Sequence, residues 1–272
     1  MSRSRSDEGD GHLSHGSGAA EDAPNKTYFL IRRLHSLCGI VPVGVFLLFH
    51  ILVNASVLDT PAAFQDRVDM IHSMGKFLVP VEIFGIFIPI LFHALLGIKI
   101  ILSGRPNPMS YTYGASWRYA LQRWTGMIAF VFIMVHLWHM HWIGSPFGGG
   151  FFDPNDATRT AASAMQRSVF WAPFYAFGLL ASVYHFSNGI WTSLITWGIT
   201  IGANAQKKAG YACAVFGIVL SVMGLATVIK LRTTDPDTLA VPSHVQQDDS
   251  EAVAATATAS PAFKTDGSET QE

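Results

Sequence analysis

The sequence predicts an all-α polytopic membrane protein with five transmembrane helices in one bundle. Half of its 272 residues are hydrophobic and only 14% are charged. This composition is typical of a membrane protein rather than of a soluble domain. Five apolar stretches reach the length of about 20 residues that a helix needs to cross a bilayer. They lie near residues 33–57, 78–103, 119–143, 169–200 and 209–231.

Short segments separate these stretches, and three of the four contain proline. The four separating segments are residues 59–61, 103–108, 145–150 and 204–208. Residues 1–27 are rich in Ser, Gly and Asp and lack an apolar core, so we expect a disordered tail and not a cleavable signal peptide. Residues 233–272 predict a second disordered tail. The transmembrane domain is therefore expected over residues 28–232.

The basic residues near the helix ends indicate an orientation, because cytoplasmic loops carry an excess of Lys and Arg. A cytoplasmic N-terminus puts nine of them inside and six outside. The inner set is Lys26, Arg32, Arg33, Lys99, Arg105, Arg118, Arg123, Lys207 and Lys208; the outer set is Arg67, Lys76, Arg159, Arg167, Lys230 and Arg232. We therefore expect an integral protein of the cytoplasmic membrane with its C-terminal tail outside.

Several classes of function are not expected from this sequence. The net charge of −1 gives no sign of nucleic-acid binding. Cys38 and Cys213 both lie in apolar runs, without the paired spacing of a zinc site, an iron–sulfur cluster or a covalently attached haem. The chain also has no glycine-rich motif for binding a nucleotide or flavin. His12 and His15, in the N-terminal tail, are not expected to bind a metal.

Four histidines, each inside a separate apolar stretch, are the main functional signal. They are His50, His93, His136 and His185. An ionisable ring at membrane depth is costly, so four of them require an explanation. Two helices that each supply one imidazole can hold the iron of a b-type haem, and four such helices can hold two haems.

The depths of the four histidines divide them into two pairs. At a rise of about 1.5 Å per residue, each histidine lies roughly 20 Å into its helix. Because consecutive helices run in opposite directions, His50 and His136 fall in the outer half of the membrane, and His93 and His185 in the inner half. This arrangement predicts two bis-histidine haems at two depths. The alternatives are hydrogen bonds between helices and a single proton path.

Glycines follow two of these histidines at a spacing of four residues. Gly97 lies four residues after His93, and Gly189 four residues after His185. Positions i and i+4 share a helix face, so a glycine there would leave room for a flat macrocycle. The alternative is ordinary close packing of membrane helices at small residues.

On these residues, the chain resembles the di-haem cytochrome b subunit of succinate dehydrogenases and fumarate reductases, of the five-helix, single-anchor type. The matching stretches cover most of residues 28–230. They are Arg32-Arg33-Leu34-His35-Ser36-Leu37 with Gly39 and Pro42; Phe49-His50; Phe92-His93-Ala94 with Gly97; Leu121-Gln122-Arg123 with Thr125-Gly126; Val135-His136-Leu137-Trp138; and Tyr184-His185-Phe186-Ser187-Asn188-Gly189 with Trp197-Gly198-Ile199-Thr200.

The resemblance implies the haem ligands and the partners. His93 and His185 would bind the iron of the proximal haem, nearer the cytoplasm, and His50 and His136 that of the distal haem. The chain would carry electrons between a membrane quinone, with a leaning toward menaquinone, and a catalytic head of a flavoprotein and an iron–sulfur subunit. Succinate–fumarate chemistry would occur on that head, and the whole complex could form a dimer. The protein would lie in a bacterial cytoplasmic membrane.

Polar residues at the inner helix ends are further candidates. Arg32, Arg33 and His35 could pair with haem propionates or dock the iron–sulfur partner. Ordinary positive-inside anchoring is the alternative for the two arginines, and Arg123 poses the same question. Ser187, with the neighbouring Asn188, could hydrogen-bond a propionate or backbone carbonyls.

Glu82 is the carboxylate that lies inside a predicted span, near the depth of the distal haem. An ionisable residue within a membrane is a functional candidate by default. We expect Glu82 to exchange protons with a quinone, and the alternative is a residue that extends to the membrane surface. Some relatives that reduce fumarate carry a membrane glutamate just before the fourth-helix ligand. Here Val183 and Tyr184 stand at those positions, so a proton path by that route is not expected.

Three further histidines are expected near the outer surface. His139 and His141 could serve as alternative ligands or quinone contacts, but we expect them in an interfacial aromatic belt with Trp138 and Trp142. His72 is expected to be a surface residue. Two other functions stay open: a di-haem anchor of a nitrate reductase, formate dehydrogenase or hydrogenase, and a haem-free transporter that uses histidines for protons.

Overall fold

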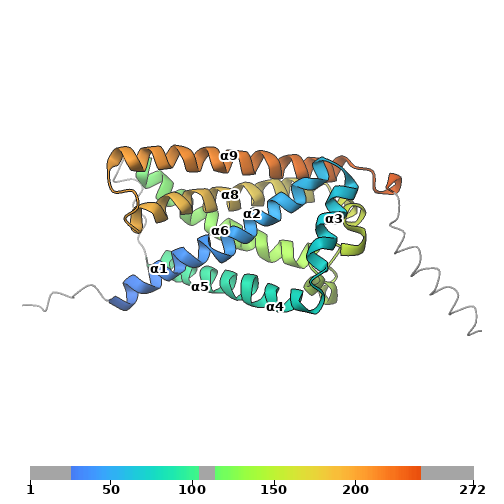
Figure 1. Ribbon diagram of the computed structural model, residues 1–272, viewed down its shortest axis with the longest axis horizontal. Coiled ribbons are helices and arrows are strands. Elements are labelled where there is room, and N and C mark those ends of the chain that lie inside the picture. Colours follow the sequence, from blue (N-terminus) through green and yellow to red (C-terminus); the bar gives the residue numbers. More distant parts are fainter. Residues whose placement is uncertain (1–25, 104–113, 240–272) are drawn as a thin grey trace, which may run out of the picture. The chain divides into compact units, whose positions relative to one another are not determined.

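The computed structural model describes residues 26–103 and 114–239, and within those ranges it is all helical, without a strand. Most of the two predicted tails therefore lies outside the described residues. Among the described residues, the boundary between two compact units falls between Leu34 and His35. The prediction of an all-α bundle is confirmed for the described part of the chain (Figure 1).

The helices follow the five predicted stretches. The helices that form the spans are α1 (Lys26–Ile40), α2 (Pro42–Ala55), α4 (Leu78–Glu82), α5 (Ile88–Ser103), α6 (Gly114–Met140), α8 (Trp171–Thr196) and α9 (Ala203–Thr233). A π-helical turn, η3 (Ile83–Phe87), joins α4 to α5. Short helices occupy the connections. Those with three residues are η1 (Ser56–Leu58), η2 (Gly75–Phe77), η5 (Pro154–Asp156) and η6 (Pro236–Thr238), and η4 (Trp142–Phe147) is longer. Two short helices, α3 (Pro61–His72) and α7 (Ala157–Gln166), were not predicted.

Within residues 26–103 and 114–239, four segments are long and apolar enough to cross a membrane by themselves: Phe29–Leu58, Gly75–Leu102, Trp117–Met140 and Ala203–Thr233. The remaining predicted span, residues 169–200, corresponds to α8, which follows α7 at a bend of 104°. Buried polar side chains such as Ser182, Ser187 and Asn188 make α8 less apolar than the other spans. The first span is divided at Pro42, because proline lacks the backbone N–H that would continue the helix.

Helix α8 lies between α6 and α9, and glycines allow these helices to approach closely. Gly210, Gly217 and Gly224 recur every seven residues on α9. A Cβ at Gly217 would lie 2.7 Å from the Ser187 hydroxyl, and one at Gly224 would lie 2.5 Å from Leu179 on α8. This period of small residues packs α9 against α8, as is usual in membrane bundles.

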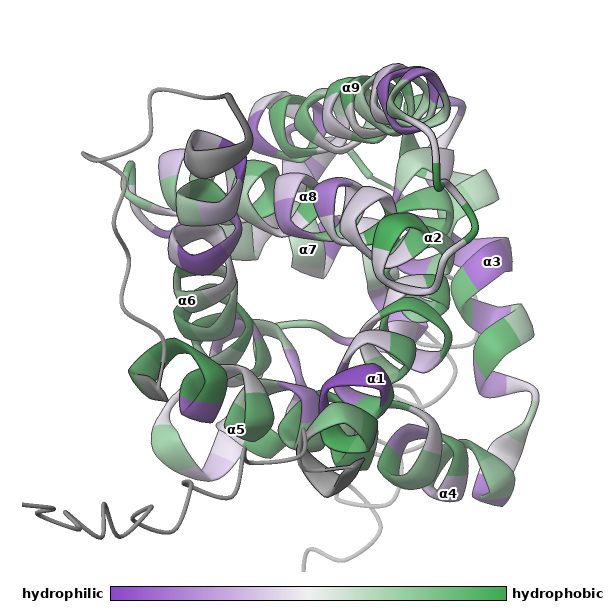
Figure 2. Cartoon of the chain, turned by 90° about the vertical axis from the view of Figure 1, so that its left-hand side faces the viewer, coloured by the Kyte–Doolittle hydropathy of each residue, from purple (hydrophilic) through white to green (hydrophobic). Residues whose placement is uncertain are grey.

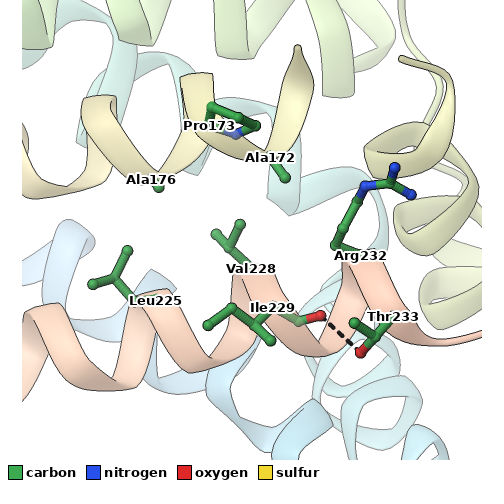
Figure 3. A pocket seen from close by; sticks show the side chains of 8 residues that line it. All are labelled: Ala172, Pro173, Ala176, Leu225, Val228, Ile229, Arg232 and Thr233. Carbon is green, nitrogen blue, oxygen red and sulfur yellow. Dashed lines mark hydrogen bonds between the residues drawn. The ribbon is translucent and has the colours of Figure 1, made fainter. Parts of the chain in front are cut away.

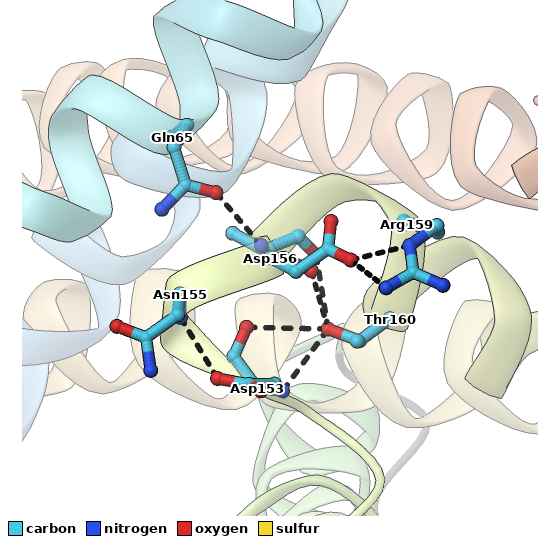
Figure 4. Close-up of polar contacts among 7 residues, drawn as sticks. Gln65, Asp153, Asn155, Asp156, Arg159 and Thr160 are labelled. Carbon is cyan, nitrogen blue, oxygen red and sulfur yellow. Dashed lines mark hydrogen bonds and ion pairs between the residues drawn. The ribbon is translucent and has the colours of Figure 1, made fainter. Parts of the chain in front are cut away.

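One end of the bundle, which we call the capped end, carries the two unpredicted helices. It is the end at which α2 and α6 finish and α8 begins, and α3 and α7 pack there. The Gln65 amide of α3 donates to the Pro154 carbonyl at 2.7 Å and accepts from the Ala157 N–H at 2.8 Å. Asp156 and Arg159 form an ion pair at the start of α7 (Figure 4).

The largest buried apolar cluster lies at the capped end. Its fully buried members include Val57 of η1, Phe64 of α3 and Met165 of α7. By contrast, α5 and α9 expose many large apolar side chains, such as Leu95 and Val215. Figure 2 shows hydrophobic residues along both helices. Exposed apolar side chains along a span are what a lipid-facing surface requires.

An apolar groove of about 330 Å³ runs between the start of α8 and the end of α9. Ala172 and Pro173 line one side, and Val228 and Ile229 line the other (Figure 3). The lining residues are distinct from all the predicted haem and quinone residues. The groove is therefore not the site that the sequence predicts.

Candidate functional site

His93 of α5 and His185 of α8 face each other in the half of the bundle away from the capped end. Their ring centres are 6.0 Å apart, and the ring planes are inclined by 79°. The Nδ1–H of His93 donates to the His35 carbonyl, and that of His185 donates to the Gln122 carbonyl, both at 3.0 Å. Because a carbonyl can only accept, each Nδ1 carries the proton, which leaves Nε2 with a free lone pair in the neutral ring.

A glycine on the facing helix makes room for each of these two rings. A Cβ on Gly39 would overlap the His93 ring, and a Cβ on Gly126 would lie 2.8 Å from Cε1 of His185. The facing helices thus bring a glycine against the imidazole and a carbonyl to its Nδ1. We call His93 and His185 the backbone-held pair.

Gly97 and Gly189, the glycines that follow His93 and His185 by four residues, likewise lie against side chains of the facing helices. A Cβ on Gly97 would lie 3.3 Å from Nε2 of His35, and a Cβ on Gly189 would lie 3.4 Å from Nε2 of Gln122. His35 also stacks on His93, with ring centres 4.1 Å apart. Gly97 and Gly189 therefore face residues next to the backbone-held pair. Their predicted role in clearing space for a macrocycle stays a prediction.

His50 of α2 and His136 of α6 form the second pair, nearer the capped end. Their ring centres are 5.8 Å apart, and the planes are inclined by 75°. Side chains rather than backbone carbonyls contact these rings. Nε2 of His50 lies 3.5 Å from the Asn54 amide nitrogen, and Nδ1 of His136 lies 3.3 Å from the Tyr175 hydroxyl. We call His50 and His136 the side-chain-held pair.

The Tyr175 hydroxyl also contacts a third histidine. It lies 2.9 Å from Nδ1 of His139, whose side chain is fully buried and stacks on Trp171 with ring centres 3.7 Å apart. The expectation that His139 belongs to an interfacial belt is therefore wrong. Because His139 lies three residues after His136, its side chain points into the bundle, where Tyr175 and Trp171 enclose it.

The spacing within both pairs suits a shared metal ion. Metal–imidazole bonds are about 2 Å long, so two imidazoles on one metal have ring centres about 6 Å apart. Within residues 26–103 and 114–239, no three His, Cys, Asp or Glu side chains are grouped to hold a metal ion. A haem iron takes only its axial ligands from the protein, so two imidazoles suffice.

Gln122 and Arg118, beside the backbone-held pair, were not predicted as site residues. Gln122 donates from its amide to the His185 carbonyl at 3.0 Å and accepts from the Asn188 amide at 2.8 Å. The Arg118 guanidinium donates to the Asn188 side chain at 3.0 Å and stacks over Trp191. The signal for Gln122 was available, because Gln122 and Gly126 repeat the four-residue spacing of His185 and Gly189.

The other predicted cofactor residues make local contacts. Arg123 donates to the Ile101 carbonyl and so ties the end of α5 to α6. The Ser187 hydroxyl donates to the Tyr184 carbonyl at 3.3 Å, which is the backbone alternative considered for it. Arg33 stacks over Phe29, and Arg32 is exposed.

Glu82 lies at the end of α4, and its carboxylate meets His141, the residue that follows α6. Glu82 Oε1 is 3.6 Å from His141 Nε2. Both side chains are about one-fifth exposed. Burial lowers the pKa of the His141 imidazole, while the Glu82 carboxylate opposes that shift. His72 is exposed on α3, as predicted.

Comparison with known proteins gives one informative similarity. No family model matches the chain. A succinate dehydrogenase cytochrome b558 subunit from Bacillus subtilis (strain 168) is 34% identical to it over 200 residues. Those residues make up 74% of this chain and 95% of the relative. The similarity therefore extends over almost the whole length of the relative.

Proposed function

Because the chain belongs to the family of cytochrome b membrane-anchor subunits of succinate dehydrogenase, we propose that it binds two b-type haems and serves electron transfer with membrane quinone. The observation that carries the proposal is the presence of two imidazole pairs, with ring centres 6.0 and 5.8 Å apart. When bound, the haems supply one-electron redox chemistry between the catalytic subunits and the quinone.

The backbone-held pair would hold the proximal haem through the Nε2 atoms of His93 and His185. Histidines that bind metals usually donate their other ring N–H to a carbonyl or carboxylate, which fixes the tautomer and the ring orientation. Both Nδ1–H groups make such a bond to a backbone carbonyl. His35 acts beside this pair through its carbonyl and its stacked ring.

The side-chain-held pair would hold the distal haem through His50 and His136. We propose that the Nδ1–H of His136 donates to the Tyr175 oxygen and that the tyrosine hydroxyl donates to Nδ1 of His139. Each polar group then keeps one role, since a phenol has one proton to donate and lone pairs to accept with. Nε2 of His136 is thereby left free to bind the iron.

Membership in this family supports two partners, the flavoprotein and the iron–sulfur subunit, which would carry the dicarboxylate chemistry. The basic residues support docking of these subunits at the end away from the cap, where Lys207 and Lys208 begin α9. Arg32, Arg33 and Arg123 would serve that docking or pair with haem propionates. The capped end would then face the outside, and we propose that menaquinone reacts there.

Glu82 is the proposed proton-exchanging residue of that quinone site. Its carboxylate lies within the span Gly75–Leu102, and a π-helical turn follows it directly. Such turns occur frequently at functional sites. Replacing Glu82 by Gln should slow quinone-linked turnover by at least about tenfold while both haems stay bound. Unchanged turnover would remove Glu82 from the site.

The decisive experiment measures haem and electron entry on the purified complex. Pyridine haemochrome analysis should give two b haems per chain, and succinate should reduce them in the same sample. Absence of haem would favour a transporter that uses histidines for protons. Two haems that succinate cannot reduce would point to another catalytic partner, such as that of a nitrate reductase, formate dehydrogenase or hydrogenase.

A further inference from the structure

His141 contacts Glu82 at the capped end of the bundle. Glu82 lies inside the second span, whereas His141 follows the last residue of the third span, Met140. Their side chains meet at 3.6 Å, between Nε2 and the carboxylate. The contact therefore joins a carboxylate within the membrane segment to a ring at the start of a surface connection.

The hydrogen bonds of His141 fix which nitrogen carries its proton. The Ile143 backbone N–H points at Nδ1 of His141 at 3.4 Å, so Nδ1 is the acceptor. The neutral ring then has its proton on Nε2, the atom that faces the Glu82 carboxylate. The Nε2–H of His141 is thus placed as the donor and the Glu82 carboxylate as the acceptor.

We propose that His141 is the proton relay between Glu82 and the outer aqueous phase. The inference rests on the proposed quinone site at Glu82 and adds the path by which that carboxylate regains or loses its proton. Histidine suits this role because its charge changes near neutral pH and its two nitrogens can exchange protons on opposite sides.

The proton balance of the relay is as follows. Reduction of a quinone to a quinol consumes two electrons, supplied by the complex, and two protons. For each proton, protonated Glu82 gives its proton to a quinone oxygen and becomes a carboxylate. A hydronium ion of the outer aqueous phase protonates Nδ1 of His141 and becomes water, and the imidazolium passes its Nε2 proton to Glu82. Tautomer exchange then returns the ring to its starting form, and quinol oxidation runs the same steps in reverse.

The surroundings of His141 support this assignment. Phe87 of η3 and the neighbouring Trp142 contact the ring, and neither titrates. Glu82 is the acidic group at contact distance among the described residues, and His136 is near enough to interact electrostatically. Because burial lowers the pKa of His141, its protonated form readily gives up a proton.

The test compares variants of the whole complex in membranes. His141→Ala should lower succinate-driven menaquinone reduction by about 100-fold, the lower end of the range expected for loss of a proton-transfer group. Both haems should keep their spectra and should still be reduced by succinate. Imidazole added to the buffer should restore much of the rate, because it can carry protons in the space that the side chain leaves.

Two further variants make the result specific. His141→Gln can still hydrogen-bond Glu82 but cannot relay a proton, so it should be as slow as His141→Ala. His72→Ala, which removes an exposed histidine from α3, should keep the normal rate. A normal rate in His141→Gln, or slow His141→Ala turnover that imidazole does not restore, would overturn the relay.

The Glu82→Gln variant separates the relay from the site on which it rests. If Glu82→Gln is slow and both His141 variants run at the normal rate, the relay is wrong and the quinone site stands. If all three variants run at the normal rate, both ideas are wrong. Loss of a haem in His141→Ala, with normal turnover in His141→Gln, would assign the residue a structural role.

Discussion

The two histidine pairs differ in what orients their rings. In the backbone-held pair, carbonyls of neighbouring helices accept both Nδ1–H groups at 3.0 Å, and glycines lie against the rings. In the side-chain-held pair, His50 is near the Asn54 amide and His136 is near the Tyr175 hydroxyl. The ring-centre distances of the two pairs therefore differ by only 0.2 Å, although different groups orient the rings.

This difference has consequences for how each pair can change. A backbone carbonyl survives every side-chain substitution, so the backbone-held pair depends mainly on close helix packing. The side-chain-held pair depends on individual polar groups, which a single substitution can remove while the helices stay in place. The first pair should accordingly respond to added volume, and the second to lost hydrogen bonds.

Removal of single imidazoles should have the largest effect and tests the pairing itself. His93→Ala and His185→Ala should each lower the haem content from two to one and abolish the same spectral component. His50→Ala and His136→Ala should abolish the other component. Pyridine haemochrome analysis and low-temperature optical spectra measure both quantities. Loss of the same component in His93→Ala and His136→Ala would refute the pairing.

Added volume at Gly126 should act on the backbone-held pair alone. A Cβ there would lie 2.8 Å from the His185 ring, so Gly126→Val should displace the ring and release most of the proximal haem. Gly202→Val is the matched control, because a Cβ at Gly202 would meet nothing within 4 Å. Retention of two haems in Gly126→Val would contradict the proposed ring position.

The sequence predicted the spans and the pairs of histidines better than it predicted their surroundings. Apolar length and residue depth depend on one helix at a time, and they placed His50 with His136 and His93 with His185. Contacts such as that of Tyr175 with His139 depend on how helices are rotated toward each other. The prediction for His139 was wrong because two residues of the neighbouring α8, Trp171 and Tyr175, enclose its ring.

The capped end was missed for a related reason. Helices α3 and α7 are too short to register as apolar stretches, and α7 reads as a mixed polar segment rich in alanine. Their amphipathic faces can be recognised only when η1 and α9 supply the apolar residues that cover them, such as Val57 and Leu231. In the same way, the four-residue spacing of Gln122 and Gly126 can be assigned a role only when α6 is known to pack against α8.

Loss of a hydrogen bond at the capped end should have a smaller effect than displacement of a histidine ring or loss of a haem ligand. Gln65→Ala would leave the Ala157 N–H and the Pro154 carbonyl without their partner, at a cost of about 1–3 kcal/mol. Hydrogen exchange should rise in α3 and α7, with the proximal haem spectrum unchanged. Asp66→Ala, at an exposed neighbouring position, is the control and should leave exchange unaltered.

The smallest expected effect is a shift in the potential of the distal haem. A hydroxyl that accepts the Nδ1–H of His136 makes the imidazole a stronger electron donor and favours the oxidised iron. Tyr175→Phe removes that acceptor. Loss of this hydrogen bond, at about 1 kcal/mol, corresponds to a rise of about 40 mV in the reduction potential of a one-electron couple.

The proximal haem gives this measurement an internal reference, because its ligands bond to carbonyls that Tyr175→Phe leaves in place. Redox titration of the variant should move one component upward and leave the other unchanged. Tyr211→Phe, at an exposed position on α9, should move neither. Equal shifts of both components would mean that Tyr175 acts on the bundle as a whole, and the distinction between the two pairs would then lose its basis.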